Sequence, residues 1–266
     1  MLGARGLPSP TEALPGRSEV TGKGLGQSAP GTRAVLGKVI ALGPATHAVS
    51  GNPTVPPFPA EMQAAIFGMG CFWGVKQLFW ELPGVFSTQV GYAGGFTPNP
   101  NYEEMCTGLT GHAEVVRVIF DPQKISSEKL FKVFWEYHGP TQGMQQQEDV
   151  GTQYRSVICT LGPQQQAAAL CSRDAYQQEL REQQHGDTTT VIEPAAAFYY
   201  TEGYHQQYLH KVPRGYCGLK GTGVTCPLAS GEATSCPLTC PHVPGIAGRY
   251  PHVTGQPHTL QLPTSH

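Results

Sequence analysis

The sequence predicts an α+β fold: a two-layer sandwich with a mixed β-sheet around a ferredoxin-like core, followed by a long coil-rich C-terminal segment. Short apolar runs mix with amphipathic segments, but without the regular strand-helix repeat of a doubly wound fold. All 3 Trp, nine of the 10 Phe and ten of the 11 Tyr lie between Glu61 and Cys226. By contrast, 16 of the 24 Pro lie outside that stretch. We therefore expect one structured core of about this extent.

The segments on either side of this core have the composition of flexible chain. Residues 1–60 are rich in Gly, Pro, Ser and Ala without periodicity, so we interpret them as a flexible N-terminal arm. The first 15 residues lack the apolar core of a secretory signal, which favours a reducing compartment, mitochondrial or cytoplasmic. A mitochondrial targeting segment has weak support, because the basic residues are thinly spread. Residues 228–266 hold few charges and many prolines, and we expect them to be disordered.

The first half of the core predicts a strand, a helix and a second strand. Residues 64–69 suit a buried strand, and apolar residues at helical spacing then continue until Pro83-Gly84 ends the helix. Residues 85–92 form the next strand, which a pair of glycines closes. The loop that follows contains one helical turn at 102–106.

The second half of the core adds three strands and two helices. In order, they are a strand at 113–120, a helix capped by Ser126 or Ser127, a strand at 154–160, a helix at 163–184 and a strand at 189–199. From Tyr204 the chain becomes too rich in glycine for a regular element, and such a coil can bend back over the core.

The charge and hydropathy patterns exclude several classes of partner. The formal net charge is -2 and only 14% of residues are charged, so the chain offers no basic face for nucleic acid and no polybasic run for anionic lipid. No apolar run approaches the ~20 residues that span a bilayer. We expect no membrane or nucleic-acid partner, and a monomer.

The run Gly-Met-Gly-Cys-Phe-Trp-Gly at 68–74 places a thiol where the predicted strand becomes a helix. The macrodipole and the unpaired N–H groups of a helix N-terminus favour an anion, so we expect Cys71 to ionise easily and act as a nucleophile. A purely structural alternative is that Gly70 and Gly74 only permit close packing of the helix on the strand. Three other cysteines, Cys106, Cys159 and Cys171, are interpreted as buried small hydrophobic residues.

Polar residues further along the chain can serve such a thiol. The motif Gly-His-Ala-Glu at 111–114 places a carboxylate at the start of an apolar strand, where burial would raise its pKa and let it hold a proton near neutral pH. Tyr102, Asp149 and the run at 151–155 would add polar groups around the same cleft. Each of these residues could also be a simple turn or surface residue.

The combination of motifs is far more specific than any one of them. The motifs occur in the order Gly-Cys-Phe-Trp-Gly at 70–74, Gly-Tyr-Ala-Gly-Gly at 91–95, Thr-Gly-His-Ala-Glu at 110–114, Gly-Thr-Gln-Tyr-Arg-Ser at 151–156, His-Gln-Gln-Tyr-Leu at 205–209 and Gly-Tyr-Cys-Gly at 215–218. Together they closely resemble the A-type peptide methionine sulfoxide reductases, and the sequences of the motifs are most similar to those of the vertebrate members. The resemblance covers about residues 58–227.

This resemblance implies a reaction. In the family the motif cysteine, here Cys71, attacks the sulfur of methionine-S-sulfoxide, free or within a protein, and is left as a sulfenic acid. The sulfoxide oxygen leaves poorly until it is protonated, and the residue that matches the family's acid is Glu114.

The resemblance also assigns the surroundings of the reacting atoms. Tyr102 and Tyr154 match the hydroxyl donors to the sulfoxide oxygen, and Asp149 matches the carboxylate that supports this network. Phe72 and Trp73 match the aromatic wall around the substrate methyl group.

Two further cysteines match the family's recycling thiols. Cys217 would attack Cys71 to form a disulfide and release water, and Cys226 would move that disulfide outward. Thioredoxin, or dithiothreitol in vitro, would then reduce it, so no bound cofactor and no metal are implied. The resemblance thus divides the chain into an arm at 1–60, a catalytic domain with its recycling tail at 61–227, and an extension at 228–266, with repair of oxidised proteins as its role.

A structural zinc site is one alternative for the tail. Its potential ligands are Cys217, Cys226, Cys236, Cys240 and His242. Strong zinc sites usually show two close pairs of ligands, whereas only Cys236 and Cys240 are close here.

A cysteine hydrolase is the other alternative. It would need His112 or His205 within hydrogen-bond reach of Cys71, which the sequence does not reveal.

Overall fold

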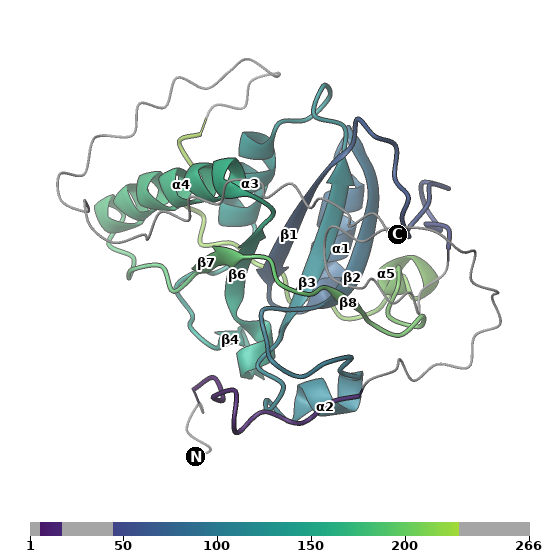
Figure 1. Ribbon diagram of the computed structural model, residues 1–266. Coiled ribbons are helices and arrows are strands. Elements are labelled where there is room, and N and C mark those ends of the chain that lie inside the picture. Colours follow the sequence, from purple (N-terminus) through teal and green to yellow (C-terminus); the bar gives the residue numbers. More distant parts are fainter. Residues whose placement is uncertain (1–5, 18–44, 229–266) are drawn as a thin grey trace, which may run out of the picture. The chain divides into compact units, whose positions relative to one another are not determined.

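The main sheet of the protein has six strands in the order β7-β6-β1-β3-β2-β8 (Figure 1). The computed structural model describes residues 6–17 and 45–228, all in one compact unit. The strands are β1 Gln63–Met69, β2 Val85–Ala93, β3 Ala113–Phe120, β6 Ser156–Thr160, β7 Val191–Pro194 and β8 Tyr199–Tyr200. Neighbouring strands are antiparallel except β6 and β7, which run parallel, so the sheet is mixed.

Three helices pack on one face of this sheet: α1 Phe72–Trp80, α3 Ser127–Glu136 and α4 Pro163–Glu182. The units β1-α1-β2 and β3-α3-β6, with the strand order β6-β1-β3-β2, form the split βαβ arrangement of a ferredoxin-like core. The predicted α+β sandwich with a mixed sheet is confirmed.

The alternation of side chains along the strands builds a core on each face. On β1, Phe67 and Met69 belong to the large cluster with the helices, while Ile66 belongs to a smaller cluster on the opposite face. Irregular chain supplies the other layer of that smaller cluster, including Val55 and Leu161. The helix-covered face is the one that carries the site described below.

Most predicted elements are found within one or two residues of their expected bounds. The Ser126 hydroxyl accepts the N–H of Lys129 at 3.1 Å and caps α3, and Pro163 stands in the first turn of α4. The helical turn at 102–106 is α2 (Tyr102–Cys106). The structure adds the small hairpin of β4 (Gln145–Gln146) and β5 (Asp149–Val150), and α5 (Tyr208–Lys211).

Two predicted strands needed correction. The strand expected at 154–160 begins only at Ser156, because Tyr154 closes a 3-10 turn, η1 (Thr152–Tyr154). The strand expected at 189–199 is two strands on opposite edges of the sheet. β7 pairs with β6 and ends at Pro194, and the chain then crosses the sheet so that β8 pairs with β2.

Two described pieces of the segment 1–60 lie against the core. Leu14 donates its N–H to the carbonyl of Leu109 at 3.0 Å, and residue 17 donates its N–H to the carbonyl of Pro98 at 3.0 Å. His47 is 1% exposed and is hydrogen-bonded to the Thr88 hydroxyl at 2.9 Å. Of the predicted extension at 228–266 only its first residue is among the described residues, so that prediction falls outside them.

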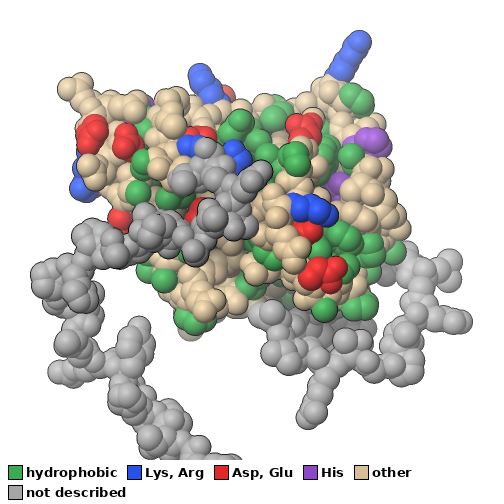
Figure 2. All heavy atoms as spheres, turned by 90° about the horizontal axis from the view of Figure 1, so that it is seen from above, with side chains coloured by type: hydrophobic (Ala, Val, Ile, Leu, Met, Phe, Trp, Pro, Cys, Tyr) green, Lys and Arg blue, Asp and Glu red, His purple; other side chains and the backbone are tan. Residues whose placement is uncertain are grey.

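The surface mixes charges of both signs. In the view of Figure 2, acidic, basic and hydrophobic side chains are interspersed, in keeping with the small net charge. Among the described residues, no helix has the length and apolar character to cross a membrane.

Candidate active site

Cys71 occupies the N-cap of α1. Strand β1 ends at Met69, and Gly70 then takes a φ of 99°, in the left-handed region that favours glycine. Cys71 itself has φ -54° and ψ 118°, and the first helical residue follows directly. The thiol is therefore at the start of the helix, as the sequence predicts.

Side chains from two other elements hold the first amide groups of α1. The Cys71 N–H donates to Oε1 of Gln146 in β4 at 2.5 Å, and the Phe72 N–H donates to Oε2 of Glu114 in β3 at 3.1 Å. These N–H groups have no partner inside the helix, so the two side chains satisfy them and fix the helix terminus. The second contact also brings the Glu114 carboxyl next to the thiol.

Burial keeps the Cys71 thiol protonated. The residue is 8% exposed, and desolvation raises the pKa of its thiol, with a further rise from the nearby Glu114 carboxyl. The N–H of Trp73 favours the thiolate but offsets only part of this rise. The prediction of an easily ionised thiol is therefore wrong, because desolvation outweighs the attraction of the helix terminus.

Glu114 is a buried carboxyl that holds a proton near neutral pH. It is 2% exposed, and burial raises its pKa to about 8. The N–H bond from Phe72 lowers the pKa and the charge of Asp149 raises it, both by less than burial does. The predicted proton donor therefore lies at the thiol in its protonated form.

Tyr102 and Tyr154 contribute two hydroxyl groups to the same space. Burial raises the pKa of each above its usual value, so both are proton donors at neutral pH. Glu114 and Cys71 contribute to both shifts, so the four groups lie within electrostatic reach of one another.

The backbone of Tyr102 is anchored from two sides. Asn101 accepts the N–H of Glu104 at 2.8 Å, and Glu104 in turn accepts the N–H of Asn101 at 3.0 Å, which makes a complete capping box for α2. The carboxylate of Glu202 accepts the N–H of Tyr102 itself at 3.0 Å. These bonds fix the position of the tyrosine although α2 has only 5 residues.

Asp149 joins the site to the glycine-rich tail. Its Oδ2 accepts a hydrogen bond from the hydroxyl of Tyr216 at 2.8 Å, and its charge contributes to raising the pKa of Cys71 and Glu114. The tail residue that it holds immediately precedes Cys217 in the sequence.

The two aromatic residues after the thiol have different surroundings. Phe72 is 1% exposed and belongs to the main core, whereas Trp73 is half-buried. The Trp73 ring stacks on Tyr208 with centroids 3.9 Å apart, and its indole N–H donates to Nδ1 of His205 at 3.1 Å. Trp73 is thus the aromatic side chain with a surface that a substrate can reach.

Among the described residues, neither histidine of the hydrolase alternative makes a hydrogen bond to Cys71. The two ring nitrogens of His112 contact the Thr97 carbonyl at 2.8 Å and the N–H of Gly95 at 3.0 Å. The Nδ1 of His205 accepts the Trp73 indole N–H, and its Nε2 is buried without a hydrogen-bond partner in the described part of the chain. Neither ring is placed as a base for Cys71, so the geometry does not favour acyl transfer.

Cys217 lies on the first turns of α1, close to the nucleophile. An added β-carbon at Gly74 would come within 2.5 Å of the Cys217 sulfur, so the absence of a side chain at Gly74 makes room for this thiol. Cys217 is exposed, and it is among the groups that raise the pKa of Cys71. The structure therefore brings these two predicted thiols together.

Cys226 is held away from them, in the core against α3. It is 0% exposed. Its N–H donates to Oε1 of Glu136 at 2.9 Å, and its carbonyl accepts a hydrogen bond from the Lys132 ammonium group. Among the described residues, no group of three or more His, Cys, Asp or Glu side chains could hold a metal ion.

A family model described as peptide methionine sulfoxide reductase matches residues 63–227. This chain belongs to that family. The protein from Rhodospirillum centenum named peptide methionine sulfoxide reductase MsrA is 56% identical over 227 residues, covering 85% of this chain and 94% of its own length. The mitochondrial peptide methionine sulfoxide reductase of Bos taurus is 56% identical over 220 residues, covering 83% of this chain and 86% of its own length.

Solved structures agree with this assignment. Methionine sulfoxide reductase A of Corynebacterium diphtheriae superposes with a TM-score of 0.66 at 39% identity, covering 85% of this chain and 100% of its own. The reduced form of Mxr1 from Saccharomyces cerevisiae superposes with a TM-score of 0.57 at 31% identity, covering 65% of this chain and 94% of its own. The A-type resemblance predicted from the motifs is confirmed.

In this methionine sulfoxide reductase several supporting residues were not predicted from the sequence. Gln146 lies in a run of glutamines that gives no local signal, whereas His205 belongs to a motif that was matched without a role. Arg155, predicted near the cleft, instead donates to the carbonyls of Gly94 and Gly111 at 3.2 and 3.0 Å and ties loops together. The expected burial of Cys159 is confirmed, but Cys106 is exposed and Cys171 is only half-buried.

Proposed function

We propose that the chain reduces methionine-S-sulfoxide, free and within polypeptides, by the chemistry of Cys71. The observation that carries this proposal is a thiol at the N-cap of α1 beside the protonated carboxyl of Glu114. A nucleophile and a proton donor that share one buried helix terminus can cleave a sulfur–oxygen bond in a single step.

The first step transfers oxygen from the substrate to the enzyme. The Glu114 proton passes to the sulfoxide oxygen while the Cys71 sulfur attacks the sulfoxide sulfur, and the thiol proton replaces the one lost by the carboxyl. This attack joins the two sulfurs and releases the protonated oxygen from the methionine sulfur as hydroxide. The hydroxide then attacks the Cys71 sulfur, so the sulfur–sulfur bond breaks, methionine leaves with its electron pair, and Cys71 is left as a sulfenic acid. No proton is consumed overall.

The remaining site residues bind and polarise the sulfoxide. Tyr102 and Tyr154 donate hydrogen bonds to the oxygen as negative charge builds on it, and Asp149 supports this network through its charge and its bond to Tyr216. Trp73 and the buried Phe72, which precedes it in α1, border the substrate methyl group.

Two thiols then return the enzyme to its starting state. Cys217 attacks the sulfenic acid, which forms a disulfide with Cys71 and releases water. Cys226 attacks Cys217, Cys71 leaves as a thiol, and a dithiol reductant such as thioredoxin reduces the new disulfide. The electrons thus come from the reductant, and neither an organic cofactor nor a metal takes part.

The proposal extends to the organisation of the chain. Residues 61–227 act as the catalytic domain with its recycling tail, and the chain works as a monomer in the repair of oxidised proteins. The name of the bovine relative supports a mitochondrial location, with the cytoplasm as the other compartment where a reducing thiol system is present.

Turnover of the two epimers tests the proposal. The purified full chain with dithiothreitol should reduce methionine-S-sulfoxide and leave the R epimer, and Cys71→Ser should lose this activity. Cys159→Ser, at a buried cysteine outside the site, is the matched control and should keep it. Failure to reduce the S epimer, or equal use of both epimers, would contradict the proposal.

A further inference from the structure

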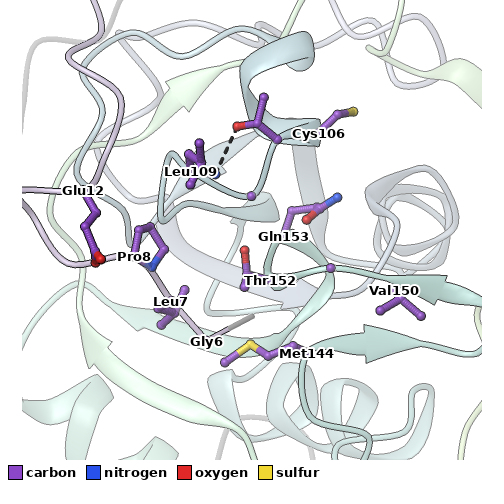
Figure 3. A pocket seen from close by; sticks show the side chains of 13 residues that line it. Gly6, Leu7, Pro8, Glu12, Cys106, Leu109, Met144, Val150, Thr152 and Gln153 are labelled. Carbon is purple, nitrogen blue, oxygen red and sulfur yellow. Dashed lines mark hydrogen bonds between the residues drawn. The ribbon is translucent and has the colours of Figure 1, made fainter. Parts of the chain in front are cut away.

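A cavity lies between three segments that are far apart in the sequence. It has a volume of about 470 Å³. Figure 3 shows Leu7 and Pro8 on one side and Val150 on the other, with Thr152 and Gln153 between them. This cavity takes no part in the chemistry proposed above.

Two walls of the cavity continue directly into residues of the active site. The cavity meets Cys106, the last residue of α2, and the first residue of this helix is Tyr102. On the other wall, Val150 follows Asp149 and Gln153 precedes Tyr154. A group in the cavity is therefore close to a sulfoxide bound at the thiol.

The third wall is the segment at 6–12, which is hydrogen-bonded within itself and is followed by a hydrogen bond to the core. Glu12 accepts hydrogen bonds from the N–H and the hydroxyl of Ser9 at 2.9 and 2.7 Å, and Leu14 bonds to the loop after α2. The Ser9 bonds lower the pKa of Glu12, so it is an anion. Among the described residues that line the cavity, only Glu12 is charged.

The lining is complementary to a peptide segment with an apolar or basic side chain. Leu7, Met144 and Val150 supply apolar surface, and Val150 is 58% exposed. Gln153 is 7% exposed, and its Oε1 has no hydrogen-bond partner among the described residues, so it is free to accept an N–H. The anion Glu12 would repel an acidic side chain.

We infer that this cavity is a subsite for polypeptide substrates, which binds a residue next to the oxidised methionine. It favours apolar, lysine or arginine side chains there and disfavours aspartate and glutamate. The inference rests on the proposed function, since it assigns the recognition of the same substrate beyond its reacting side chain. Free methionine sulfoxide does not reach the cavity and gains nothing from it.

The test compares three substrates on the full chain. They are the S-sulfoxide of N-acetylmethionine amide, and two peptides in which that residue is flanked on both sides by Leu and Lys or by Glu. The peptide with Leu and Lys should have about a tenfold higher kcat/KM than the peptide with Glu, chiefly through KM.

Substitutions at Leu7 test whether the preference for the peptide with Leu and Lys depends on the cavity. Leu7 is 43% exposed and lies outside the catalytic machinery. Leu7→Lys should raise kcat/KM for the Glu peptide by about two- to fivefold, and Leu7→Glu should lower it by a similar factor. Val49→Glu is the matched control, because Val49 is 46% exposed and does not line the cavity. This variant should leave kcat/KM for both peptides unchanged.

The possible failures are distinguishable. Both Leu7 variants should reduce the N-acetylated substrate as the parent does. If they also treat the two peptides as the parent does, or if the parent has no preference between the peptides, the subsite is disproved while the proposed function stands. If the parent reduces none of the three substrates, the proposed function fails first.

Discussion

Glu114 accepts the backbone N–H of Phe72 at 3.1 Å, so the acid and the nucleophile of this site share one helix terminus. The same geometry explains why the carboxyl is neutral. Burial raises its pKa to about 8, and the single N–H bond is too weak to reverse that rise. The Glu114 carboxyl is therefore protonated at neutral pH and can donate this proton to the substrate.

Glu114→Gln should lower kcat/KM for methionine-S-sulfoxide by about 10²- to 10⁴-fold, because the amide cannot supply the proton. In the parent enzyme kcat/KM should fall as the pH rises through about 8, where the carboxyl ionises. Steady-state rates between pH 6 and 10 would measure both effects. A variant that kept full activity would rule out this acid.

The free energy of unfolding should also depend on the ionisation of Glu114. The pKa of Glu114 is higher in the folded protein than its ordinary value of 4.5, so the folded state binds the proton more tightly. This proton contributes a few kcal/mol to the free energy of unfolding. The contribution is fully present below pH 4.5 and is lost as the pH rises through about 8. Urea unfolding at pH 5 and pH 9 should therefore show a larger loss for the parent than for Glu114→Gln. Glu182→Gln, on the exposed end of α4, should behave like the parent.

The sequence predicted the parts of this molecule that depend on local patterns. Hydrophobic periodicity located the strands of the ferredoxin-like core, and the glycines around Cys71 indicated the turn from strand to helix. The partners of Gln146 and Glu202 were not predictable, because they lie 75 and 100 residues away in the sequence. The division of the strand expected at 189–199 has a similar cause, since the two edges that it pairs with are set by the whole sheet.

The ionisation of the Cys71 thiol was likewise not predictable from the local sequence. A helix start is visible in the sequence, whereas the degree to which a thiol there is desolvated depends on every element around it. Cys71 is at the helix start, as predicted, but burial raises the pKa of its thiol where the sequence predicts a lowered one. Cys226 is a second example, since nothing near it in the sequence indicates that α3 binds it.

Gly74→Ala should separate the two halves of the reaction. The added methyl group would come within 2.5 Å of the Cys217 sulfur and displace this thiol, while alanine suits the helix better than glycine. Without reductant, the first methionine should be released as fast as in the parent, but the disulfide between Cys71 and Cys217 should form at least about tenfold more slowly. Rapid quench and mass analysis would follow both. Gly186→Ala, where an added carbon meets nothing within 4 Å, is the control.

His205 should act as a positioning residue for Trp73. His205→Leu removes the acceptor of the indole N–H, which leaves a polar group unpaired beside the substrate. We expect KM for the sulfoxide to rise about three- to tenfold with a smaller change in kcat. His205→Asn keeps an acceptor and should recover much of the affinity. If the two variants gave the same KM, this hydrogen bond would have no part in binding.

Cys226 has to leave its place against α3 before it can reach Cys217, and Glu136 is one of two α3 side chains that bind its backbone. The Glu136 carboxylate accepts the Cys226 N–H at 2.9 Å and also pairs with Lys132 at 3.0 Å. Removing this acceptor in Glu136→Ala should favour the released tail by about 1 kcal/mol, which corresponds to about fivefold faster labelling of Cys226 by a thiol reagent.

The same variant should speed the transfer of the disulfide from Cys71–Cys217 to Cys217–Cys226, because release of Cys226 precedes that step. Stopped-flow mixing with substrate, followed by acid quench and mapping of the disulfides, would measure the transfer. Glu182→Ala, on the exposed surface of α4, should change neither rate. If Glu136→Ala labelled faster but transferred the disulfide no faster, release of the tail would not limit the relay, and the chemistry of thiol exchange would set its rate.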